Sequence, residues 1–188
     1  MDEIDRQPRI APLEPPFASP VAEELARWQP PGKDPIALFR TLTRHLPLAR
    51  AMYPLGHYFL SGESSIALRD REIVIDRVCA RCRCEYEWGV HARVFGRAAG
   101  LSETQLAATT AAGEKGCWSE SDRLLIRMVD ELHETATISD DLWSELTGHW
   151  REEQLIEMLA LVGQYHSISF LANSLRVPLE AWAPRFPR

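Results

Sequence analysis

Residues 71–98, REIVIDRVCARCRCEYEWGVHARVFGRA, hold three of the chain's four cysteines among acidic and imidazole side chains. On a helix that begins near Cys84, Glu87 and His91 follow at offsets of three and seven, so the three side chains share one face. The set provides a latent nucleophile and two groups that transfer protons near neutral pH. Glu72 lies twelve residues before Cys84 on an amphipathic segment, 69–81, and a hairpin of the two helices would bring it to the same face.

The spacing resembles the signature of the alkylhydroperoxidase D and carboxymuconolactone decarboxylase family. That signature is a glutamate, eleven residues, a cysteine, two residues, a second functional residue, three residues and a histidine; here it is Glu72, Cys84, Glu87 and His91. The likeness continues through DRLLIRMVDELH and QLIEMLALVGQYHSISFLANSL, and covers roughly residues 36–180. The resemblance implies an all-α bundle of the AhpD-like type, no cofactor, and a homo-oligomer that is a dimer, trimer or hexamer.

The sequence departs from the family at one position. Peroxidatic members resemble one another in a C-x-x-C pair that cycles between dithiol and disulfide, and Glu87 stands where the second cysteine is expected. Cys79 and Cys82 also form a C-x-x-C, but five residues out of register. The departure puts the redox cycle itself in question.

Three functions therefore compete. The family resemblance favours a thiol-dependent hydroperoxide reductase, in which Cys84 is the nucleophile, Glu72, Glu87 and His91 assist it, Cys82 is a candidate resolving thiol, and a thiol protein is the reductant. The missing cysteine favours a cofactor-free decarboxylase or isomerase of an anionic lactone or keto acid, with His91 and Glu87 as acid and base and an arginine holding the carboxylate. The third is a non-catalytic helical oligomer with a vestigial site.

Other reactive side chains have simpler interpretations. Cys79, Cys82 and Cys117 can be ordinary core or loop residues, and we expect no metal site, because helical geometry spreads Cys79, Cys82, Cys84 and His91 around the axis. His133 lies near a helix C-terminus, where an imidazolium interacts well with the helix dipole. Candidate pocket-lining side chains are Tyr86, Trp88 and His166.

Composition and charge limit the number of domains, the class of binding partner and the location that can be expected. The chain has 188 residues, 45% hydrophobic and 26% charged, which is typical of one globular domain. A net charge of −6 without a basic stripe argues against nucleic acid, and leaves a small molecule as the expected substrate. The polar start MDEIDRQPRI does not resemble a signal peptide, and no uninterrupted apolar run approaches the ~18 residues of a membrane helix. We therefore expect a cytoplasmic location without membrane contact.

Eight of the thirteen prolines fall within residues 1–35. We predict a proline-rich arm over residues 1–34, lying on the domain or on a partner subunit, with a short helix over 21–28. A single helical domain would then occupy residues 35–188. Its first helix is predicted to begin with Asp34 as N-cap and Pro35 at the first helical position.

Further helices are predicted from periodicity and caps over 47–62, 69–81, from Cys84, from Ser102, from Ser119, over 139–149 and over 151–176. No segment alternates with a period of two for long, which indicates an all-α bundle. A weak internal repeat supports helix pairs: shifts of 52 and 74 place Glu72 opposite Leu124, Gly89 opposite Gly163 and His91 opposite Tyr165. The second half would then be scaffold.

Overall fold

The computed structural model describes residues 7–29, 32–111 and 116–187. Over these residues the chain is all-α, as predicted, with no strand. The helices are α1 (Ser19–Trp28), α2 (Ala37–Leu42) with the short 3₁₀ helix η2 (Thr43–His45), α3 (Leu46–Leu60), α4 (Leu68–Arg81), α5 (Glu85–Val94), α6 (Glu103–Thr109), α7 (Glu120–Thr135), α8 (Asp140–Thr147) and α9 (Glu152–Leu175).

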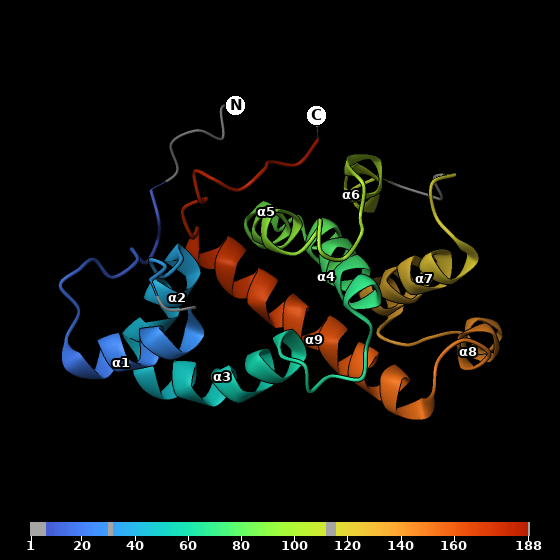
Figure 1. The fold of residues 1–188 in the computed structure, drawn as a ribbon, viewed down its shortest axis with the longest axis horizontal. Coiled ribbons are helices and arrows are strands. Elements are labelled where there is room, and N and C mark those ends of the chain that lie inside the picture. The colour runs from blue at the N-terminus through green and yellow to red at the C-terminus, as the bar shows by residue number, and fades with distance from the viewer. Residues whose placement is uncertain (1–6, 30–31, 112–115, 188) are drawn as a thin grey trace.

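Helix α9 runs across the middle of the molecule, with α1–α3 on one side and α4–α7 on the other (Figure 1). Helix α4 packs against α5, α7 and α9, and every residue from Arg71 to Cys79 is buried. A helix that is covered on all sides normally carries apolar residues around its whole circumference. Because α4 also carries charged residues in this stretch, each of them needs an internal partner or must become neutral.

A tight reversal joins α4 to α5. Arg83 adopts a left-handed conformation with φ of 52°, and the backbone N–H of Cys84 donates to the carbonyl of Cys79 at 2.7 Å. Cys84 then becomes the N-cap of α5. The prediction of a helix that begins near Cys84 is confirmed, and the reversal brings α5 back against α4.

The caps agree with the sequence at most helix starts. Ser102 with Gln105 and Ser119 with Asp122 form capping boxes, and the side chain of Ser139 caps α8. The predicted start at Asp34 and Pro35 is wrong, because α2 begins at Ala37 after Ile36. Its free N–H groups are satisfied from a distance instead: Ala37 donates to the Glu180 carboxylate at 2.7 Å and Leu38 to the Tyr86 hydroxyl at 3.0 Å.

The proline-rich segment lies along the helical domain. The N–H of Arg9 donates to the carbonyl of Leu175 at 2.9 Å, and Leu13 donates to Arg40 at 3.2 Å. The side chain of Arg40 returns a bond to the carbonyl of Leu13 at 2.8 Å. Residues 1–6 and 30–31 of the predicted arm fall outside the described residues, and the boundary at residue 34 stays a prediction.

Among the described helices, α9 alone is long and apolar enough to cross a bilayer by length and composition, with a mean hydropathy of 1.3. It packs against α4, α5 and α8, and it contributes buried side chains such as Met158 and Leu161 to the core. Core helices of globular proteins pass the same test. The cytoplasmic location stays a prediction.

Candidate active site

His91, on α5, forms the centre of a buried polar group. Its Nδ1 lies 2.8 Å from Oε2 of Glu72 on α4, and its Nε2 lies 3.0 Å from the hydroxyl of Tyr165 on α9. The rings of His91 and Tyr165 meet edge to face, with centroids 5.1 Å apart. Three helices therefore fix the imidazole, and all three side chains are buried.

Arg71 forms a buried ion pair with Glu72. The guanidinium Nε donates to Oε1 of Glu72 at 2.7 Å, and Nη1 donates to the carbonyl of Phe59 at 3.0 Å. With Arg71 on one oxygen, Glu72 accepts a hydrogen bond from Nδ1–H of His91 on the other. The Nε2 atom of His91 is consequently the one that can gain or lose a proton in chemistry.

The surrounding carboxylates shift the pKa of His91 upward. Burial alone would lower it, but the charge and hydrogen bond of Glu72, together with the charge of Glu87, outweigh burial and raise the net pKa above its ordinary value. The imidazolium form is therefore retained to higher pH than for a free histidine. Removing the proton produces a base already oriented by Glu72.

Glu87 is the second proton-transfer group. Its Oε2 lies 3.7 Å from Nε2 of His91, while Oε1 is buried and has no hydrogen-bond partner among the described residues. Burial raises the pKa of Glu87, and the neighbouring His91 offsets only part of this effect. Two groups with raised pKa values thus face each other and titrate as a coupled pair.

Asp76 lies one helical turn after Glu72 on α4 and is completely buried. Neither of its carboxyl oxygens has a hydrogen-bond partner within the described part of the chain. Burial, assisted by the charge of Glu72, raises the pKa of Asp76 well above its ordinary value. The neutral, protonated form of Asp76 therefore persists to higher pH than in a free aspartic acid.

Cys84 adjoins this group but has the properties of a neutral thiol. Burial, followed by the charge of Glu87, raises the pKa of Cys84 to about 12. The backbone N–H of Glu87 and the hydroxyl of Ser169 lower the pKa of Cys84, but by less than burial and the charge of Glu87 raise it. At neutral pH only a trace of the thiolate, the form that attacks peroxides, is present.

The remaining cysteines are also shifted toward the thiol. Burial raises the pKa of Cys79 well above its ordinary value, and burial raises that of half-buried Cys82. The hydroxyl of Ser169 has no partner at standard hydrogen-bond geometry, yet it lies close enough to Cys82 and Cys84 to lower the pKa of both. Both thiols thus approach the same residue of α9.

A cavity of about 940 Å³ opens onto the acid–base pair. Glu87, His91 and Tyr165 line it, whereas Cys84 is not among its described lining residues. Three basic side chains, of Arg27, Lys33 and Arg93, also line this cavity. The space suits a small molecule, and the basic side chains suit an anion.

Arg93 is the basic group best placed to bind such an anion. It is exposed, lines the cavity two residues after His91 on α5, and forms no ion pair or hydrogen bond with the described part of the chain. Arg81, by contrast, is already paired, because it contacts Glu134 at 2.6 Å and Asp130 at 3.5 Å.

The predicted pocket lining by Tyr86, Trp88 and His166 is wrong. The Tyr86 hydroxyl bonds to Glu180 at 2.8 Å, and the Trp88 indole N–H donates to Thr109 at 2.9 Å, so each ring faces another part of the core. His166 lies on the face of α9 that meets α7, where it contacts His133. None of the three lines the large cavity.

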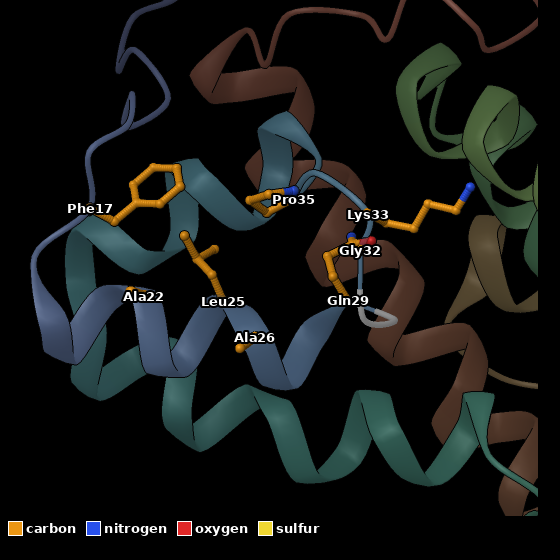
Figure 2. A pocket seen from close by; sticks show the side chains of 8 residues that line it. All are labelled: Phe17, Ala22, Leu25, Ala26, Gln29, Gly32, Lys33 and Pro35. Atoms are coloured by element: carbon orange, nitrogen blue, oxygen red, sulfur yellow. The ribbon is translucent and has the colours of Figure 1, made fainter.

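A smaller cavity of about 330 Å³ lies between α1 and the segment that leads to α2 (Figure 2). Its walls are mainly apolar, including Phe17, Leu25 and Pro35. Figure 2 shows the side chain of Lys33 extending away from these apolar residues. Among the described residues that line this cavity, Lys33 is the one with a titratable side chain.

The structure brings together Glu72, Glu87 and His91, of which Glu87 and His91 line the cavity, whereas Cys84 is not among the described lining residues. Sequence reasoning missed Arg71, Asp76 and Ser169 as members of this environment. The weak repeat did contain a signal for Tyr165, because it paired that residue with His91 and the two are in contact. The catalytic roles of these residues stay predictions.

Solved structures share the architecture. An uncharacterized peroxidase-related protein from Ralstonia eutropha JMP134, described as an alkylhydroperoxidase AhpD core, is 13% identical and has a TM-score of 0.78, with 92% of this chain and 93% of that chain covered. An uncharacterized peroxidase-related protein from Silicibacter sp. TM1040 is 14% identical, with a TM-score of 0.77 and 95% and 96% coverage. At these identities the likeness establishes the fold.

A third structure is that of a protein of unknown function from Agrobacterium tumefaciens, which has been suggested to be the antioxidant defence protein AhpD. It is 21% identical, has a TM-score of 0.67, and covers 74% of this chain and 95% of its own. No curated protein matches the sequence. Residues 47–123, which include Glu72, Cys84, Glu87 and His91, match the model of the carboxymuconolactone decarboxylase family. Residues 47–123 are thus similar to the carboxymuconolactone decarboxylase family, and the chain has the AhpD-like helical fold.

Proposed function

We propose that this protein is an acid–base enzyme that moves a proton on a small carboxylate-bearing keto acid or lactone, as a decarboxylase or isomerase does. The observation that carries the proposal is the placement of His91 and Glu87, both with raised pKa values, on the wall of a cavity from which the Cys84 thiol is set back. Catalytic acids and bases work best when their pKa values lie near the working pH.

The proton path follows from the contacts. In neutral His91, Nε2 accepts a proton from the substrate carbon, and the Glu72 carboxylate stabilises the resulting imidazolium through Nδ1–H. Protonated Glu87 gives its proton to the oxygen on which negative charge develops, since its Oε1 has no competing partner among the described residues. Transfer of the proton from His91 to a different carbon of the resulting enol, with the enol proton returning to Glu87, completes an isomerisation. In a decarboxylation, a proton on the carbon replaces the carbon dioxide that leaves.

The basic side chain of Arg93 supports the choice of an anionic substrate. Its guanidinium can hold a carboxylate in a bidentate contact without first giving up an internal ion pair. A carboxylate held at Arg93 would leave the rest of the molecule to extend toward Glu87 and His91.

A hydroperoxide reductase is the second candidate, because Cys84 is the N-cap of α5 and both Cys82 and Cys84 approach Ser169. In that reaction the Cys84 thiolate attacks the peroxide, an alcohol leaves, and Cys82 condenses with the sulfenic acid to give a disulfide and water. A thiol protein would then reduce the disulfide. The high pKa of Cys84 weighs against this candidate.

One set of variants separates the two. Proton–deuterium exchange next to the carbonyl of keto acids and lactones, followed by NMR in D₂O, reports acid–base turnover, and peroxide consumption with a dithiol reports the reductase. We expect His91→Gln to slow exchange by about 10²–10⁴-fold and Cys84→Ser to keep most of the rate. Exposed His149 provides the matched control, His149→Gln.

Peroxide turnover that Cys84→Ser abolishes, without exchange on any carbonyl compound, would contradict the acid–base proposal. Exchange that survives His91→Gln would contradict it as well.

A further inference from the structure

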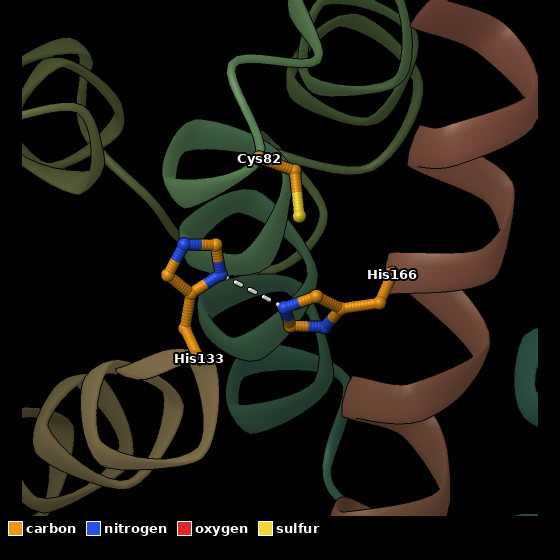
Figure 3. Close-up of side chains that lie close together, drawn as sticks. All are labelled: Cys82, His133 and His166. Carbon is orange, nitrogen blue, oxygen red and sulfur yellow. Dashed lines mark hydrogen bonds between the residues drawn. The ribbon is translucent and has the colours of Figure 1, made fainter. Parts of the chain in front are cut away.

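A second group of reactive side chains lies apart from the acid–base site. Cys82 at the end of α4, His133 in the last turn of α7 and His166 in the middle of α9 converge at a half-buried position (Figure 3). One ligand atom from each residue lies within 4.8 Å of the other two. Figure 3 shows the thiol and both rings directed toward a common space.

The tautomer of His166 is fixed in the form that a metal requires. Its Nδ1 lies 2.9 Å from the carbonyl oxygen of Val162, which can only accept, so Nδ1 carries the hydrogen. In the neutral ring Nε2 then has a free lone pair, and this atom faces Nδ1 of His133 at 2.9 Å. Metal-binding histidines typically donate their second ring N–H to a carbonyl or carboxylate in this manner.

The other two ligands are also held by their helices. The carbonyl of Cys82 accepts a bond from the side chain of Asn173 on α9 at 2.9 Å, which fixes the end of α4 against α9. The ion pair between Arg81 and Glu134 at 2.6 Å fixes the same end of α4 against the last turn of α7. The three elements that supply the ligands are thus tied together beside the site.

The spacing is close to that of a tetrahedral centre. With zinc–nitrogen and zinc–sulfur bonds of ~2.0–2.3 Å, neighbouring ligand atoms lie about 3.3–3.8 Å apart. The two histidine nitrogens, 2.9 Å apart, share one proton and would separate by a few tenths of an ångström when an ion replaces it. The sulfur of Cys82 lies within 4.8 Å of both histidine nitrogens, so a small rotation of its side chain would bring it to bonding distance of the same ion.

The local charge permits a cation. Arg81 is the nearest basic side chain that contacts these helix ends, and two carboxylates, of Asp130 and Glu134, already pair with it. Deprotonation of Cys82 on binding would add one negative charge directly at the ion.

We infer that Cys82, His133 and His166 form a binding site for a zinc-class divalent ion, with a fourth position open to water or an external ligand. A thiolate and two imidazoles suit zinc or cobalt, whereas magnesium and calcium require oxygen ligands. Metal binding would withdraw Cys82 from disulfide chemistry and is independent of the proposed acid–base reaction.

Cobalt(II) titration of the purified full-length protein tests this site. We expect one equivalent to bind, with thiolate-to-cobalt charge-transfer absorption and the strong visible bands of a four-coordinate ion, and zinc to displace it. Cys82→Ser should abolish the charge-transfer band. His133→Gln and His166→Gln should weaken binding at least ~10-fold, since even the loss of an outer-shell partner costs this much. Half-buried Cys117 and exposed His149 supply the matched controls, Cys117→Ser and His149→Gln.

A measurement on the unsubstituted protein tests the site even if the variants fail to fold. Peptide mass spectrometry measures the rate at which iodoacetamide alkylates each cysteine. Zinc should slow the alkylation of Cys82, whereas Cys117 should react at the same rate with and without zinc. Magnesium should protect neither cysteine. Absence of stoichiometric binding, a charge-transfer band that survives Cys82→Ser, or equal protection of both cysteines would overturn the inference. Because the tests measure metal binding, their failure leaves the acid–base proposal unaffected.

Discussion

Helices α4 and α5 bury very different side chains from those that α7 and α9 bury, although both pairs belong to the core. The first pair buries charged residues along most of its length: Arg71, Glu72, Asp76, Arg77, Glu87 and His91. In the second pair Asp122 is the buried charged residue, and most other buried positions are apolar. The buried charged groups are thus concentrated in one helix pair, while the buried side chains of the other are mainly apolar, with the hydroxyls of Tyr165 and Ser169 among them.

The second pair also holds the first in register. Arg69 bonds to Asp122, Arg77 to Asp130 and Arg81 to Glu134, each across 53 residues. A constant separation means that α4 and α7 run side by side in the same direction. The predicted helix-pair duplication stays a prediction, but the division into a reactive half and a supporting half agrees with the side chains that each half buries.

The largest expected difference between the halves concerns buried and exposed ion pairs. Arg71→Met leaves the Glu72 carboxylate buried without its partner, and we expect it to lower the free energy of unfolding by about 3–5 kcal/mol. Arg127→Met removes an exposed pair of α7 with Glu145 and should cost about 0–1 kcal/mol. Urea denaturation of both variants measures the difference. Equal losses would show that burial of charge does not distinguish the halves.

Two glycines at matched positions provide a smaller contrast. A methyl group at Gly89 on α5 would overlap the carbonyl oxygen of Pro184, so Gly89→Ala should destabilise the protein by about 1–3 kcal/mol. At Gly163 on α9 an added methyl group meets no atom within 4 Å, and Gly163→Ala should stabilise the helix by about 0.5–1 kcal/mol. Thermal unfolding should give opposite signs, and a loss in both variants would contradict this packing difference.

The last contrast concerns pH dependence, and its effect is seen as a slope and not as a change at a single pH. Asp76 has a higher pKa in the folded than in the unfolded chain, so its contribution to stability is complete below its ordinary pKa of 3.8 and is lost as pH rises through the folded value. In that window the folded state binds the extra proton, and unfolding free energy falls by roughly 1.4 kcal/mol per pH unit.

Asp76→Asn should remove this slope, so that the variant gains stability relative to the parent protein as pH rises from the acidic range. Urea midpoints measured across the pH range provide the test. Asp141→Asn, an exposed position on α8, is the control and should leave the slope unchanged. Parallel curves for the parent protein and Asp76→Asn would show that Asp76 is not held neutral by the fold.

The helices and most caps could be predicted from local sequence, because apolar periodicity and the Ser102, Ser119 and Ser139 caps act within one turn. The start of α2 could not, since Glu180 and Tyr86 satisfy its N–H groups from distant parts of the chain. The same distinction applies to the site. Spacing placed Cys84, Glu87 and His91 on one face, but it gave no indication that Arg71 would pair with Glu72.

The sequence by itself determined the all-α class, the order of the helices and which helix pair carries the reactive residues, because helix periodicity is a local property. Only the tertiary structure decided that His91 is held between Glu72 and Tyr165, that the large cavity reaches Glu87 but not Cys84, and that Cys82, His133 and His166 converge. Distances, burial and pKa shifts depend on which helices pack together. Cys82, His133 and His166, for example, are 33 to 84 positions apart in the chain and meet only after folding.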